Sequence, residues 1–256
     1  MCLMEEFILF ALIGFVAQLI DGSLGMGFGV ISSSILLAQG VPPALASASI
    51  NAAKLPTSGT AALSHLYHRN LDWQLVKHLT IFGALGGIVG ALILTNLKGA
   101  FLSVIVNFYL AGMGLLIIYR GLTNVSPRVL SAKFTRTIGL AGGFIEGIGG
   151  SWGPIVTTSL LGAGKESRYA IGSCNFSEFI VSAAVFGAFM LMFALGHWEG
   201  GSEWRETAYP VAGLVVGALP AAIFGGYLSK RAPRQALTVA VGCLALSIAV
   251  YRTVFA

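Results

Sequence analysis

The sequence is short of charge. Only 10% of its 256 residues are Asp, Glu, Lys or Arg, whereas 56% are hydrophobic. An average soluble domain is about 25% charged, and a water-soluble fold of this size needs far more polar surface. This scarcity excludes an ordinary soluble domain and predicts an all-α polytopic membrane protein. Apolar stretches of about the length that crosses a bilayer occupy His78–Leu97, Phe101–Tyr119, Ala208–Leu228 and, with its flanks, Ala236–Tyr251.

Cysteine is also scarce, and several functional motifs are missing. Cys2, Cys174 and Cys243 are odd in number and have no C-x-x-C spacing, so they indicate neither a disulfide framework nor a zinc site. No nucleotide-binding G-x-x-x-x-G-K-[ST] occurs, and the predicted loops are too short for a soluble catalytic domain. The N-terminus "MCLMEEF" lacks the basic region and cleavage site of a signal peptide. We therefore expect no cofactor, no bound metal and no removable leader.

The chain is instead rich in internal repetition. A shift of 124 residues aligns Gly27–Gly40 with Ser151–Gly164, and it also places Asn51 on Asn175 and Lys54 on Glu178. Matched polar residues in two apolar segments argue against chance similarity. The sequence predicts a first repeat over residues 1–122, a linker over 123–137 and a second repeat over 138–256. Internal repeats of this kind are typical of secondary transporters.

Each repeat begins with an apolar stretch that is broken by glycines, at Asp21–Gly29 and at Glu146–Pro154. In the first repeat the break leaves pieces of about 14 and 10 residues, too short to cross a ~30 Å core. Either each broken stretch is a re-entrant hairpin followed by three spans, or it crosses once and gives four. The first arrangement puts eleven basic residues on one side and three on the other, and the second gives eight and six. Because basic residues mark the cytoplasmic side, we expect inverted repeats with both termini outside. The net charge of +5 then reports topology rather than binding to nucleic acid.

A polar stripe lies in the middle of the predicted membrane segments. Ser47, Asn51, Lys54 and Ser58 are spaced to share one helical face, and Asn175, Glu178 and Ser182 repeat that face in the second half. Lys54 and Glu178 lie roughly 15 Å into their helices from opposite sides, which makes them neighbours at the bilayer midplane. An ionisable group at that depth costs at least ~2.5–3.5 kcal/mol and usually marks a pathway. The same two charges could form a purely structural ion pair. Ser47 and Ser58 are expected to join helices, whereas Asn51 and Asn175 are expected to line a site.

The glycine breaks supply a second feature of the predicted site. Helices that start after the breaks, near Val30 and Pro154, direct free N–H groups at the midplane, and such N-termini attract anions. Either these glycines serve the turns alone, or they let a ligand approach the backbone. For Asp21 and Glu146, which precede the glycines, the alternatives are capping of the following helix and a gating or proton-relay role. The expected contacts to substrate from the breaks are Gly25, Gly27, Gly29, Gly150, Ser151 and Gly153.

The motifs resemble those of the sulfite exporter TauE/SafE family. The resemblance rests on "IDGSLGMGFGVISSSILLAQGVPPALASASINAAK" and "LSHLYHRNLDW" in the first half, and on "GGFIEGIGGSWGPIVTTSLLGAG" and "GSCNFSEF" in the second. It covers nearly the whole chain and implies a multi-pass transporter, often an exporter, of sulfite, sulfonates or related organosulfur anions. Many members carry His and Glu where this chain has Asn51 and Lys54. A fixed cation at the midplane favours an anionic substrate.

The sequence therefore predicts a secondary transporter in the cell membrane that exports a small anion. Lys54 would be the countercharge of the substrate, and Glu178 would bind the coupling ion, expected to be H⁺. The expected partners are the anion and the lipid bilayer. A passive anion channel is a second class, and an intramembrane enzyme is a third that lacks a Ser/His/Asp or metal constellation.

Overall fold

The protein is described by a computed structural model over residues 3–96, 100–123, 131–197, 204–224, 227 and 234–255. Cys2, Lys98, Trp198, Lys230, Arg231 and the centre of the predicted linker (residues 124–130) lie outside these ranges. Every regular element within the ranges is an α-helix. The helices are α1 (Leu3–Leu24), α2 (Phe28–Ala38), α3 (Pro43–Tyr67), α4 (Trp73–Asn96), α5 (Ala100–Leu122), α6 (Ala132–Gly149), α7 (Gly153–Gly162), α8 (Ser167–Ala194), α9 (Trp204–Ile223) and α11 (Arg234–Phe255).

The predicted all-α membrane protein is confirmed. The four predicted apolar stretches fall on α4, α5, α9 and α11, although α9 ends at Ile223, short of the predicted Leu228. Within the described ranges, Phe7–Leu24, Trp73–Asn96 and Ser167–Ala194 are long and apolar enough to cross a membrane. Most of their exposed side chains are apolar, as lipid contact requires.

One prediction about the first break is wrong. Helix α1 continues through Asp21 and Gly22 to Leu24, so it has 22 residues rather than about 14 and is long enough to span. A single glycine inside a helix is tolerated at modest cost. The helix ends where Gly25 takes φ +69° and Gly27 takes φ +149°, conformations that other residues rarely adopt. Of the two pieces around the first break, α2, with 11 residues, is the one too short to cross.

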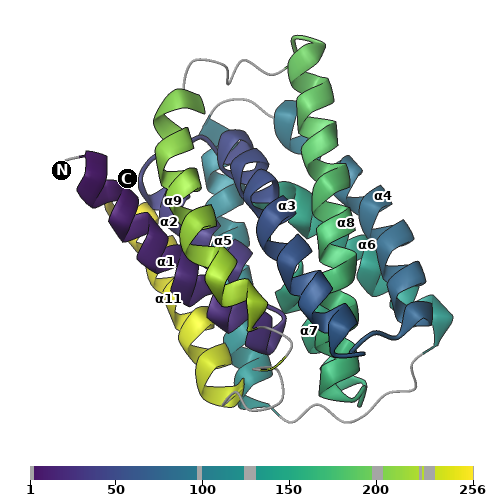
Figure 1. The fold of residues 1–256 in the computed structure, drawn as a ribbon. Helices are drawn as coiled ribbons and strands as arrows, with labels where there is room; N and C mark the ends of the chain where they lie inside the picture. Colours follow the sequence, from purple (N-terminus) through teal and green to yellow (C-terminus); the bar gives the residue numbers. More distant parts are fainter. Residues whose placement is uncertain are drawn as a thin grey trace.

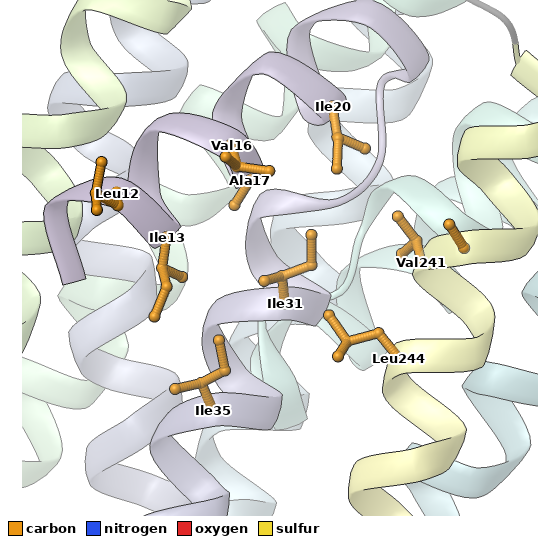
Figure 2. A pocket seen from close by; sticks show the side chains of 10 residues that line it. Leu12, Ile13, Val16, Ala17, Ile20, Ile31, Ile35, Val241 and Leu244 are labelled. Carbon is orange, nitrogen blue, oxygen red and sulfur yellow. The ribbon is translucent and has the colours of Figure 1, made fainter. Parts of the chain in front are cut away.

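Helix α2 turns back beside α1 after this break. Figure 2 shows Ile31 of α2 next to Ile20 of α1, and Ile35 next to Ile13, which is the order expected for an antiparallel hairpin. Together with α11 the two helices enclose an apolar groove of about 390 Å³. The groove is lined by apolar residues such as Val16, Val241 and Leu244, which are suited to contact with lipid hydrocarbon chains.

The helices pack in corresponding pairs. Helix α3 packs against α8 in the middle of the molecule, with α4 and α6 on one side and α1, α9 and α11 on the other (Figure 1). Helix α4 contacts α6 and α8, and α9 contacts α1 and α3. Helix α5 packs against α11. The first turn of α1 and the last turn of α11 lie at the same end of the bundle (Figure 1).

Glycines allow the two most extensive of these lateral contacts. A Cβ atom at Gly86 of α4 would lie 2.1 Å from the backbone oxygen of Leu140 in α6. A Cβ atom at Gly217 of α9 would lie 1.8 Å from the backbone oxygen of Ala11 in α1. Small residues let membrane helices approach until their backbones touch, and van der Waals packing then holds the pair. These contacts fix α6 and α1 around the central helices α3 and α8.

Candidate functional site

Lys54 lies at the centre of a buried charge cluster between the two halves of the chain. Its Nζ atom donates to Oε1 of Glu146, to Oε1 of Glu178 and to the backbone oxygen of Gly150, each at 2.7 Å. An ammonium group has three N–H donors, and all of them are used here. The side chains of Lys54, Glu146 and Glu178 are 1%, 0% and 3% exposed. Lys54 is therefore fully coordinated by the protein in this conformation.

Three helices bring these charges together. Lys54 comes from the middle of α3 and Glu178 from the middle of α8, and the packing of α3 on α8 joins them as their matched positions predicted. Glu146 comes from the last turn of α6. The sequence does not indicate Glu146 as a partner of Lys54, because no spacing along the chain relates α6 to α3. Ser182, one turn beyond Glu178, donates to Oε1 of Glu146 at 3.1 Å.

The acidic residues before the breaks cap the short helices that follow. Oε2 of Glu146 accepts a hydrogen bond from the backbone N–H of Trp152 at 2.7 Å, where α7 begins. Oδ1 of Asp21 accepts from the backbone N–H of Phe28 at 3.2 Å, where α2 begins. The capping role that the sequence left open is thus present at both breaks. Each N-terminus that was expected to attract an anion already faces a carboxylate of the protein.

The two breaks also touch each other. A Cβ atom at Gly29 would lie 1.6 Å from the backbone oxygen of Gly150, and one at Gly153 would lie 2.2 Å from the backbone oxygen of Gly25. The hydroxyl of Thr157 donates to the same Gly25 oxygen at 2.7 Å. Glycine is required here by the backbone contact between the breaks.

Asn51 and Asn175 behave alike in the two halves. The amide nitrogen of each donates to the backbone oxygen four residues earlier, Ser47 at 2.9 Å and Ile171 at 3.0 Å. Both amide oxygens are buried and have no partner among the described residues. Ser47 donates to the backbone oxygen of Gly147 at 2.9 Å, which is the helix-joining role predicted for it. A buried acceptor without a partner costs free energy, so both amide oxygens are available to a ligand or water.

The structure adds polar residues that the sequence analysis did not single out. Gln18 of α1 and Ser32 and Ser34 of α2 are buried, and their side-chain polar atoms have no partner in the described part of the chain. The ring of Tyr109 covers Gly149, and its hydroxyl is within electrostatic reach of Glu146 and Lys54. The sequence does not single out Tyr109, because it lies in an apolar run and no matched polar residue in the other half draws attention to it.

Trp152 and Cys174 join the second break to α8. The indole Nε1 of Trp152 donates to the Cys174 sulfur at 2.9 Å, and the hydroxyl of Thr157 lies 2.8 Å from the same sulfur. All three side chains are fully buried. This contact fixes the α7 end of the site against the helix that carries Glu178.

The cluster has an unbalanced charge. Asp21, which is 2% exposed, lies within electrostatic reach of Lys54, Glu146 and Glu178. Three carboxyl groups and one ammonium group give an excess of two negative charges when all are ionised. Burying uncompensated charge is costly, so the arrangement favours uptake of protons or of a cation. Among the described residues no group of three or more His, Cys, Asp or Glu side chains could hold a metal ion.

Comparison with known proteins places these residues in a family. The chain matches the family described as sulfite exporter TauE/SafE over residues 10–252. It is 35% identical over 247 residues to the "probable membrane transporter protein YtnM" of Bacillus subtilis (strain 168), covering 93% of this chain and 80% of that protein. It is 31% identical over 199 residues to the "probable membrane transporter protein ORF9" of a Sinorhizobium species, covering 73% of each chain. No solved structure matches the chain significantly.

Proposed function

The chain belongs to the sulfite exporter TauE/SafE family of membrane transporters, and from this premise we propose that it is a secondary transporter that exports a small anion. The proposed substrates are sulfite, a sulfonate or a related organosulfur anion. The proposed site is the cluster around Lys54 at the interface of two inverted repeats. The proposed location is the cell membrane, with both termini outside and the basic loops in the cytoplasm.

Reciprocal contacts between the halves support the inverted repeat. Gly29 touches Gly150, and Gly153, the counterpart of Gly29, touches Met26, the counterpart of Gly150. Contacts of this reciprocal kind arise where a twofold axis passes between two elements. The pairing of Lys54 with Glu178 joins matched positions in the same way. The packing of α4 on α6 and of α9 on α1 agrees with the same axis.

The observation that carries the proposal is that the two carboxylates bound to Lys54 differ in their number of other hydrogen bonds. Glu146 is fixed by further hydrogen bonds from Trp152 and Ser182. Glu178 has Lys54 as its one hydrogen-bond partner among the described residues. Glu178 is therefore the exchangeable ligand of Lys54. Protonation of Glu178 removes the charge that holds it to Lys54, and an anion of the substrate then takes its place at the ammonium group.

This exchange couples the anion to a proton. The anion binds only when Glu178 carries a proton, so both are bound in the same state of the protein and cross together. The direction of net transport then follows the combined gradients of anion and proton. Export results when the cell produces the anion and the outward anion gradient exceeds the inward proton gradient. Asn51 and Asn175 would bind the anion's protonated oxygen or its water through their unpartnered amide oxygens.

The test is flux of sulfite into liposomes that contain the purified protein, with and without an acidic outer buffer. We expect saturable uptake that an inward proton gradient accelerates. Glu178→Gln is expected to keep sulfite binding and to lose the acceleration by the proton gradient. Flux that does not saturate and ignores the proton gradient would favour the passive channel. Absence of both binding and flux across sulfite, taurine and other sulfonates would refute the proposed substrate class.

A further inference from the structure

A second pocket, separate from the Lys54 cluster, opens at the end of the molecule that carries Lys165 and Arg120. Its volume is about 410 Å³, within the range of small-molecule sites. It is formed where α5 and α7 end and where α8 and α11 begin. Its polar lining is Arg120, Thr123, Thr158, Lys165, Ser167, Gln235 and Thr238.

The pocket has two cations with different surroundings. Arg120 is half-buried, and the described residues give it no hydrogen bond or ion pair. Lys165 donates to Oδ2 of Asp72 at 2.6 Å, in an ion pair whose side chains are 23% and 28% exposed. Arg120 supplies a planar set of N–H donors that suits oxyanions, and Lys165 supplies a second charge once Asp72 releases it.

The pocket leads toward the proposed transport site. Met26, which lies between α1 and α2 in the first break, is part of its lining and is only 3% exposed. The Cα atom of Met26 packs against Gly153 of the second break. Gly150, three residues before Gly153, is a ligand of Lys54. The floor of the pocket is therefore one packing layer from the charge cluster.

We propose that this pocket captures the substrate anion on the basic side before it reaches Lys54. The inference rests on the proposed function and adds to it an entrance site with a stated ligand chemistry, a small oxyanion. The position that matches Lys165 in the first half is Val41, so the second cation belongs to one end of the transporter only. On the inner face of an exporter, two cations in a pocket would raise the local concentration of the anion at the entrance.

Asp72 competes with the anion in this proposal. Its carboxylate occupies Lys165, and it also caps α4 by accepting from the backbone N–H groups of Gln74 at 3.0 Å and Leu75 at 3.2 Å. Asp72→Asn keeps an oxygen for this cap but loses the charge that holds Lys165. Arg120→Gln and Asp72→Asn should therefore change anion capture in opposite directions.

The experiment measures sulfite flux from the basic side of liposomes made of neutral phosphatidylcholine. Arg120→Gln should raise KM about threefold to tenfold from that side and leave the maximal rate and the opposite side unchanged. Asp72→Asn should lower KM. Lys133→Gln, which removes an exposed charge at the start of α6 on the same side, is the matched control and should leave KM unchanged. Equal behaviour of Arg120→Gln and Lys133→Gln overturns the proposal.

Two further arms separate the alternatives. An anionic lipid presents a similar oxyanion through its headgroup. If the effect of Arg120→Gln requires phosphatidylglycerol in the liposomes, the pocket holds a lipid headgroup and the proposal is wrong. If the wild type shows no saturable flux, the proposed transport function fails, whereas the pocket is still tested by sulfite binding to the protein in detergent. Binding that Arg120→Gln loses and Lys133→Gln keeps supports the pocket, and binding that neither variant changes overturns it.

Discussion

Replacing Lys54 by methionine should destabilise the protein far more than removing a similar ion pair at its surface. The comparison is with Lys165→Gln, because the two lysines make ion pairs of nearly equal length, 2.7 Å and 2.6 Å. The lysine side chains differ in exposure, 1% for Lys54 and 23% for Lys165. The two lysines therefore differ in burial and in the number of buried partners that each change leaves behind, and both differences predict the larger loss of stability for Lys54→Met.

The expected magnitudes follow from what each change leaves behind. Lys54→Met strands Glu178 without a partner and removes one donor from Glu146, both in the interior. Removing one partner of a buried ion pair costs about 3–5 kcal/mol. Lys165→Gln leaves Asp72 in contact with water and with the N–H groups of α4, so its cost should stay below about 1 kcal/mol.

The assay is denaturant unfolding of each purified variant in the same detergent. A loss of less than about 1 kcal/mol for Lys54→Met would refute the tight coordination of Lys54 and the argument built on it. The double change Lys54→Met with Glu178→Gln removes both charges and should recover part of the lost stability, with a coupling energy measured by the double-mutant cycle. A stable double variant that still transports would show that the pair is only structural. A stable double variant that is inactive would support the transport role of Lys54.

Three further predictions concern other parts of the molecule. Gly153→Ala should destabilise the protein by about 1–3 kcal/mol, because its Cβ atom would overlap the backbone oxygen of Gly25. Gly187→Ala is the control and should not destabilise the protein, because the space around Gly187 is open. Equal unfolding midpoints of the two variants would refute the contact between the breaks. Burial raises the pKa of the Asp72 carboxyl, but the hydrogen bonds from Lys165, Leu75 and Gln74 together lower it below the ordinary 3.8. Asp72 should therefore stabilise the protein above that pH, and this stabilisation should be lost as the pH falls through the lowered pKa. Asp72→Asn should remove this loss of stability at acid pH, which is worth at most about 1 kcal/mol for so exposed a group. If the stability of the variant falls with acid as it does in the wild type, the assignment is wrong. In a cysteine-free background, an impermeant maleimide added to intact cells should label His197→Cys and not Ala132→Cys; the reverse pattern would show that the orientation is wrong.

The sequence predicted the elements of the site better than their connections. The spacing of Lys54 and the 124-residue match to Glu178 predicted a contact that the structure contains. In the proposed inverted repeat, matched positions near the twofold axis would meet each other. The partnership of Lys54 with Glu146 and Gly150 could not be predicted in this way. It depends on how α6 ends beside α3, which the backbone contact at Gly86 determines and which no periodicity along one segment encodes.

The break at Asp21 was predicted too early for a related reason. Glycine content indicates where a helix is weak, but tertiary contacts decide where it ends. Helix α1 continues through Gly22 because the N–H of Gly25 donates to the backbone oxygen of Asp21 at 2.6 Å, and because α1 packs against α9. The carboxylate of Asp21 is then free to reach forward to Phe28 and cap α2. The same residue thus ends one helix and starts the next, a dual use visible only in three dimensions.

The opposite signs of the charges at positions 54 and 178 have a physical reason in the proposed inverted repeat. A twofold axis brings matched positions into contact, so two identical carboxylates or two identical ammonium groups at these positions would repel each other in a medium of low dielectric constant. Lys54 and Glu178 attract each other instead and form an ion pair of 2.7 Å. The unlike charges at positions 54 and 178 also make the cluster asymmetric. Lys54 is attracted to Glu146, whereas Glu178 gains no attraction from Asp21. The second break is therefore bound to Lys54, whereas oxygen atoms of Gln18, Asp21 and Ser32, in and beside the first break, have no partner among the described residues. We infer that the anion proposed to replace Glu178 approaches Lys54 from the side of the first break, where these polar atoms of the described residues have no partner.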